Sequence, residues 1–111
     1  MTPKKKAKLI AQTLIDKKAQ DVVIMNLRKV TDMTHYFIVC TGESELHLKA
    51  LARELGDKIK TPWHIEGYTH AHWILLDYVD VVVHIFLKST RQYYMLEQLW
   101  GDVPTETISQ Q

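Results

Sequence analysis

The chain has 111 residues, of which 46% are hydrophobic, and 14 Lys and Arg against 13 Asp and Glu give it a net charge of +1. Chains of about 100 to 150 residues usually form one domain with one core, so we expect a single domain over residues 1–111. A near-neutral balance excludes the strongly basic composition of proteins that bind nucleic acid by charge alone. We therefore expect a partner to be recognised by shape and local charge, without sequence-specific contacts to nucleic acid.

Two absences bear on location. No run of about 18 apolar residues is available to cross a membrane, and the N-terminal lysine cluster has no apolar signal-peptide region behind it. The sequence therefore predicts a cytosolic protein. Its single cysteine, Cys40, cannot form an internal disulfide and lies in the apolar run YFIVC, which favours a buried structural thiol.

The first predicted element is a helix. Thr2 followed by Pro3 is typical of an N-cap and first helical position, and apolar residues recur at helical spacing up to about Lys18. Two apolar runs rich in β-branched or aromatic residues, 22–28 and 36–41, then predict strands covered on both faces.

A second helix follows the second strand. Ser44 can cap it, and Leu48, Leu51, Ala52, Leu55 and Ile59 form an apolar stripe at 3.6-residue periodicity that ends before Pro62.

Three further strands are predicted at 63–67, 73–78 and 81–86. Only Val79 and Asp80 separate the last two, so they must pair as an antiparallel hairpin, because a parallel crossover needs a dozen or more residues. Helices interspersed with about five strands, including an antiparallel pair, predict an α/β fold with a mixed sheet and helices packed against it.

The last predicted element is a third helix. Ser89 and Gln92 have the spacing of a capping box. The residues after Pro104 show no periodicity, so 105–111 are expected to be a loose tail. One face of this helix is expected to be apolar, formed by Tyr93, Leu96, Leu99 and Trp100.

Few residues have the pattern of a catalytic or metal site. TGES at 41–44 offers one glycine, whereas a phosphate-binding loop needs several. Asp77 and Asp80 could together hold magnesium for nucleotidyl transfer, but residues three apart on a strand do not share a face. His70 and His72 lack the spacing of a zinc site and are expected to be exposed loop residues. We predict no catalytic residue, no metal and no cofactor.

The hairpin strands instead have the pattern of an interface. A period of two places Trp73, Leu75 and Asp77 on one face, and an Asp beside large apolar residues is typical of a partner surface. Arg91 and Tyr94 are expected to point away from the apolar face of the last helix. A purely structural role, with Trp73 in the core, remains open. The predicted partner-binding residues are Trp73, Leu75, Asp77, Tyr78, Asp80, Arg91 and Tyr94.

Five segments together resemble the Iojap/RsfS family of ribosome-silencing factors, in order and over nearly the whole chain. They are DKKAQDVVIMNLR (16–28), YFIVCTGES (36–44), IEGY (65–68), WILLDYVDVVVHIF (73–86) and RQYYMLEQLWGD (91–102).

The resemblance implies a fold related to nucleotidyltransferases but without their catalytic residues. It also implies binding to the large ribosomal subunit through the ribosomal protein numbered fourteen, steric exclusion of the small subunit when nutrients are short, possible homodimers of the free protein, and no cofactor.

The chain departs from the family pattern at three positions. His35 precedes the second strand where an Asp is usual, Asn26 replaces a common Asp, and the hairpin reads DYVD, with Val79 in place of glycine. A β-branched residue tolerates a positive φ poorly, so the turn must have a different geometry or be strained.

Two other functions remain as alternatives. One is a metal-dependent nucleotidyltransferase using Asp77 and Asp80. The other is an assembly or maturation factor for the large subunit that contacts ribosomal RNA through Lys4, Lys5, Lys6 and Lys8. An RNA contact would weaken steeply with salt, and an enzyme would bind nucleotide with magnesium.

Overall fold

The computed structural model describes residues 1–95 and 103–108. Their elements in chain order are α1 (Pro3–Asp16), β1 (Gln20–Asn26), β2 (Tyr36–Gly42), α2 (Glu45–Lys58), β3 (His64–Glu66), β4 (Trp73–Asp77), β5 (Val81–Leu87), α3 (Lys88–Tyr94) and β6 (Thr105–Thr107).

The strands form one mixed sheet in the order β3-β4-β5-β2-β1-β6. The β2–β5 pair is parallel, and the other four neighbouring pairs are antiparallel. The prediction of a single α/β domain with a mixed sheet is therefore confirmed, as is the β4–β5 hairpin. The expected number of about five strands is wrong, because the sheet has six.

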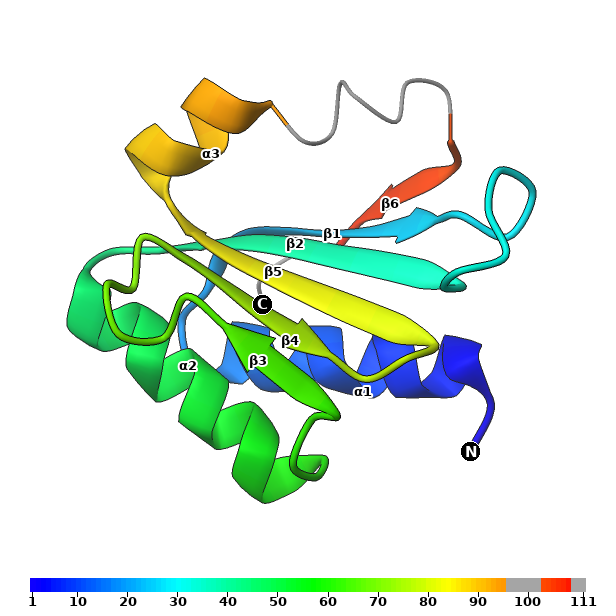
Figure 1. Ribbon diagram of the computed structural model, residues 1–111, viewed down its shortest axis with the longest axis horizontal. Coiled ribbons are helices and arrows are strands. Elements are labelled where there is room, and N and C mark those ends of the chain that lie inside the picture. Colours follow the sequence, from blue (N-terminus) through cyan, green and yellow to red (C-terminus); the bar gives the residue numbers. More distant parts are fainter. Residues whose placement is uncertain (96–102, 109–111) are drawn as a thin grey trace.

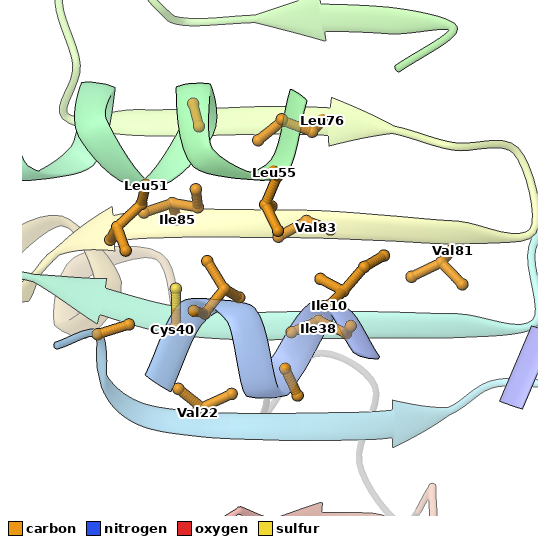
Figure 2. Close-up of a cluster of buried hydrophobic side chains, with 14 of the residues drawn as sticks. Ile10, Val22, Ile38, Cys40, Leu51, Leu55, Leu76, Val81, Val83 and Ile85 are labelled. Carbon is orange, nitrogen blue, oxygen red and sulfur yellow. The ribbon is translucent and has the colours of Figure 1, made fainter. Parts of the chain in front are cut away.

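The helices lie on both sides of this sheet. Helices α1 and α2 lie side by side on one face, which we call the first face, and α3 lies at the opposite, second face (Figure 1). Alternate side chains of β1, β2, β4 and β5 meet the apolar stripes of α1 and α2 and form the main core. Figure 2 shows this layer, in which Leu51 and Leu55 of α2 lie close to Val83 and Ile85 of β5.

Both long helices begin at the predicted caps. The Thr2 hydroxyl accepts a hydrogen bond from the Lys5 backbone N–H at 3.1 Å, and the Ser44 hydroxyl accepts one from His47 N–H at 3.0 Å. These bonds satisfy N–H groups that have no partner within the helix. Cys40 is buried in the main core, as expected, and burial raises the pKa of its thiol to about 12.

The third helix differs from its prediction. It begins after Leu87, with no side-chain cap, so the predicted capping box of Ser89 and Gln92 does not form. Tyr93 is 79% exposed instead of packing inward. Helix α3 ends at Tyr94, because the following residue, Met95, has a left-handed φ of 52°. The other residues of the predicted apolar face, Leu96, Leu99 and Trp100, lie outside the described part of the chain.

The expectation that residues 105–111 form a loose tail is also wrong for residues 105–107. Thr105–Thr107 form β6, an edge strand antiparallel to β1, and the Ile108 N–H donates to the Val22 carbonyl at 2.9 Å. The Ile108 side chain packs against the main core. Three residues are too few to show periodicity, so pairing with β1 decides their structure.

We predict that Ile108→Ala lowers the free energy of unfolding by about 1 to 2 kcal/mol, because it removes part of a half-buried aliphatic side chain. Urea denaturation followed by circular dichroism measures the change. The control is Thr107→Ala on the exposed neighbour, which should stay within about 0.5 kcal/mol of the parent chain. Equal effects of the two variants would contradict the packing of Ile108.

Candidate partner-binding site

The second face of the β4–β5 hairpin carries a ladder of large side chains. Trp73 lies opposite Phe86 in the strand register, Leu75 opposite His84, and Asp77 opposite Val82. All six point to the second face because side chains alternate along a strand. Neighbouring strand β2 adds Phe37, which pairs with Val82 in the parallel register.

These side chains line an apolar groove of about 470 Å³ near the hairpin turn, which we call the sheet groove. Its floor comes from β2, β4 and β5, and its rim comes from the β1–β2 loop, the residue before β3 and the hairpin turn. The lining residues are Thr31, Met33, Thr34, Phe37, Trp63, Leu75, Asp77, Val79, Val82 and His84.

Large apolar side chains are exposed along the rim. Met33 is 88% exposed, Trp63 76% and Val79 58%. Single exposed apolar residues are ordinary on protein surfaces, but three of them around one apolar groove are typical of an interaction site. Asp77 contributes a half-buried carboxylate to the same groove.

His84 forms a hydrogen-bonded aromatic cluster on the floor. The indole N–H of Trp73 donates to His84 Nδ1 at 3.0 Å, and the Phe37 ring meets the imidazole nearly edge-on, with ring centroids 4.7 Å apart. Burial lowers the pKa of His84 to about 4, so the ring is neutral at pH 7. Since Nδ1 accepts the indole N–H, the ring proton lies on Nε2.

The turn at the end of the hairpin is strained. Val79 has a φ of 75°, and the Asp80 N–H donates to the Tyr78 carbonyl at 3.0 Å across it. This is a γ-turn of the strained type. Asp77 Oδ1 accepts the Val79 N–H at 2.7 Å and helps to hold it. Of the two alternatives for Val79, a different turn geometry or a strained turn, the positive φ corresponds to the strained turn.

Four of the seven predicted binding residues lie together. Leu75 and Asp77 line the sheet groove, and Trp73 lies beside them, half-buried and in contact with Phe86. Tyr94 of α3, 48% exposed, lies against Trp73 with ring centroids 4.8 Å apart. Trp73 therefore lies between the groove and α3. Its packing against Phe86 and Tyr94 also gives it part of the structural role that the sequence left open.

The structure separates the other three. Tyr78 is 3% exposed on the first face, and its hydroxyl donates to the Lys60 carbonyl at 3.0 Å. Asp80 forms an ion pair with Lys6 of α1 at 2.8 Å. Arg91 points into the domain and donates to the Asp21 carbonyl at 2.8 Å and the Thr41 hydroxyl at 2.9 Å. Arg91 and Tyr94 therefore both contact the rest of the domain, whereas Tyr93, which was expected on the apolar face of this helix, is exposed.

The geometry also bears on the two alternatives. The carboxylates of Asp77 and Asp80 have different partners, the Val79 N–H and Lys6, so they do not form a pair. Among residues 1–95 and 103–108 there is no group of three or more His, Cys, Asp and Glu that could hold a metal ion. Two of the lysines considered for RNA contact are engaged within the domain: Lys6, whose side chain is 13% exposed, pairs with Asp80, and Lys8 pairs with Glu106.

Of the ten residues that line the groove, the predicted binding residues included only Leu75 and Asp77. The other eight were missed: Thr31, Met33, Thr34, Phe37, Trp63, Val79, Val82 and His84. The hairpin register could have placed Val82 and His84 on the face of Trp73, because paired residues point to the same side. No signal in the sequence shows that Met33 and Trp63 come together, since their segments meet only in the folded chain.

Comparison with known proteins decides the family. The model of the family described as ribosomal silencing factor during starvation matches residues 1–111. The chain belongs to the RsfS family. A relative named ribosomal silencing factor RsfS from Halalkalibacterium halodurans is 43% identical over 104 residues, covering 87% of this chain and 86% of the relative. The protein of that name from Bacillus subtilis is 38% identical, covering 94% of this chain and 92% of the relative.

A solved structure shows the same architecture. The crystal structure of protein CV0518 from Chromobacterium violaceum has a TM-score of 0.85 at 32% identity, covering 99% of this chain and 96% of the other. A more distant relative, mitochondrial assembly of ribosomal large subunit protein 1 from Mus musculus, is 29% identical, and the match covers 83% of this chain and 43% of the relative. In the described part of the chain, no helix is long and apolar enough to cross a membrane.

We predict that Val79→Gly raises the free energy of unfolding by about 1 kcal/mol. Relief of the left-handed strain, about 1 to 3 kcal/mol, should exceed the entropic cost of glycine, about 0.5 to 1 kcal/mol. Val30→Gly is the matched control, since Val30 is also exposed but has no positive φ, and it should be neutral or destabilising. Urea denaturation of the two variants measures the difference, and an unstable Val79→Gly would show that the turn is unstrained.

Proposed function

We propose that this chain is a cytosolic ribosome-silencing factor that binds the large ribosomal subunit through the ribosomal protein numbered fourteen and sterically blocks the small subunit. The observation that carries the proposal is the sheet groove, an apolar surface with exposed Trp63 and Met33 on its rim. Family membership and the names of the RsfS relatives support the ribosomal partner.

The groove has the chemistry of a protein interface. Interface centres are apolar and rich in aromatic residues and Met, with polar groups around them. Trp63, Phe37 and Met33 fit this composition. Asp77 adds negative charge, and ribosomal proteins are generally basic, so attraction between the two would orient the partner and speed its association.

Occlusion requires binding without turnover. Asp77 and Asp80 are engaged by different groups and do not pair, which favours a binding module over nucleotidyl transfer. Magnesium-dependent incorporation of a labelled nucleotide by the parent chain, lost in Asp77→Asn, would support an enzyme instead.

A role in assembly of the large subunit is the second candidate. It is favoured by the name of the mouse relative, which refers to assembly of the large ribosomal subunit. The lysines proposed to contact ribosomal RNA give it less support, because Lys6 and Lys8 are held in ion pairs with Asp80 and Glu106. Binding to naked ribosomal RNA that falls steeply with salt would favour this candidate.

We predict that Trp63→Ala weakens binding to isolated large subunits about thirtyfold. The side chain is 76% exposed in the free chain, and truncating an aromatic that becomes buried in an interface commonly costs about 2 kcal/mol. Cosedimentation through sucrose gradients measures binding, and suppression of the combined ribosome peak measures occlusion.

Leu46→Ala is the control for this experiment. Leu46 is 77% exposed, much like Trp63, but it belongs to α2, the helix on the first face of the sheet. Its truncation should therefore leave binding unchanged. If both variants are folded and bind as well as the parent chain, the groove is not the docking surface. If the parent chain itself migrates apart from large subunits and the combined peak is unchanged, the proposed function is wrong.

We predict that Asp77→Asn slows association with large subunits severalfold at low salt and changes dissociation little. The amide oxygen can still accept the Val79 N–H, so the substitution removes charge while keeping the turn. Both the association rate and the dissociation rate are measured by passing each variant over surface-captured large subunits at low and at high ionic strength. The charge-matched control is Asp57→Asn, at an exposed position of α2. An equal effect of both variants would exclude a specific role for Asp77.

A further inference from the structure

Two polar atoms of residues that line the sheet groove have no partner. His84 Nε2 and Thr34 Oγ1 are both buried and make no hydrogen bond. Both residues line the groove, and they are only 4% and 6% exposed. Buried polar groups in folded proteins nearly always have a partner, so each exception requires an explanation. Two exceptions beside one apolar groove indicate a site completed by another molecule.

The unpartnered nitrogen is a donor. The Trp73 indole N–H occupies His84 Nδ1 at 3.0 Å, and an indole nitrogen can only donate. A neutral ring with Nδ1 as acceptor carries its proton on Nε2. Trp73 therefore fixes the tautomer and leaves His84 with one N–H that an occupant of the groove can use. The Thr34 hydroxyl can donate or accept and places no further restriction on the occupant.

The charge of the groove restricts the complementary group. A carboxylate could accept the His84 N–H, but Asp77 lines the same groove and would repel it. An ammonium or guanidinium group offers only donors and cannot accept. An uncharged oxygen remains as the acceptor, in a carbonyl, a carboxamide or a hydroxyl group. The apolar lining requires an aliphatic or aromatic side chain next to it.

We infer that the docking segment of the ribosomal protein inserts an apolar side chain into the sheet groove and presents a neighbouring uncharged oxygen, of a carbonyl, carboxamide or hydroxyl group, to His84 Nε2–H. This inference rests on the proposed function and specifies the chemistry of the partner at the same groove. Both orphan atoms are shielded from solvent, so lining side chains must turn aside when the segment enters. One of these side chains is Phe37, whose ring centroid lies 4.7 Å from that of the His84 imidazole. Rotamer changes of this kind are common at interfaces.

The first test observes the wild-type chain. Full-length protein labelled with ¹⁵N-histidine is titrated with the purified ribosomal protein numbered fourteen of the large subunit, and the His84 ring signals are followed by NMR. In the free chain we expect the neutral tautomer with the proton on Nε2. In the saturated complex the Nε2–H proton should shift downfield and exchange more slowly with water. An unshifted signal in the saturated complex overturns the inference.

The second test compares affinities for isolated large subunits. His84→Phe keeps an aromatic ring but removes the donor, and we expect about tenfold weaker binding because the oxygen of the partner is left buried without a hydrogen bond. His70→Phe is the matched control, since His70 is exposed and lies outside the groove, and it should bind like the parent chain. Circular dichroism checks that both variants fold.

The outcomes separate the two proposals. If the parent chain binds and His84→Phe binds within twofold of it, the inference is wrong and the proposed function stands. If the parent chain binds neither large subunits nor the ribosomal protein, both fail. If His84→Phe does not fold, the NMR titration of the wild-type chain still decides, because it needs no substitution.

Discussion

The parallel pairing of β2 with β5 is the constraint on which the rest of this structure depends. All seven residues of each strand pair, from Tyr36 with Val81 to Gly42 with Leu87. A parallel pair cannot be closed by a short turn, so the chain between the strands must cross over, and it does so through α2, β3 and β4. The pair also joins the β1–β2 and β4–β5 hairpins into one sheet.

The two faces of that sheet are covered unequally, and this inequality produces the candidate site. Helices α1 and α2 bury the first face almost completely, so Ile74, Leu76 and Tyr78 are core residues. The second face has α3 at one end and the sheet groove at the other, with Trp73 in contact with Tyr94 between them. Large side chains therefore remain available near the hairpin turn. An apolar sheet face left open in this way is typical of a surface that another protein covers.

Long-range contacts hold the turn that borders this surface. Lys6 at the start of α1 pairs with Asp80, and the backbone carbonyl of Asp80 accepts the N–H groups of His35 and Tyr36 at 3.0 and 3.2 Å. Strain at Val79 persists because the surrounding structure fixes the turn from several sides. Local geometry at the rim of the groove is thus set by residues more than forty positions away in the sequence.

The sequence by itself determined the long elements and the hairpin, while tertiary structure decided the short elements and the surface. Helices α1 and α2 were predictable because their caps and apolar stripes are local signals, and β4 and β5 because a two-residue connection permits only antiparallel pairing. Strand β6 was not, since three residues become a strand only by pairing with β1. Alternation along the strand was enough to predict that Trp73, Leu75 and Asp77 share one face. The hydrogen bonds of Arg91 and the ion pair of Asp80 with Lys6 could not be predicted, because their partners are distant in sequence. Periodicity tells which residues share a face, whereas only the packed fold decides which face remains open.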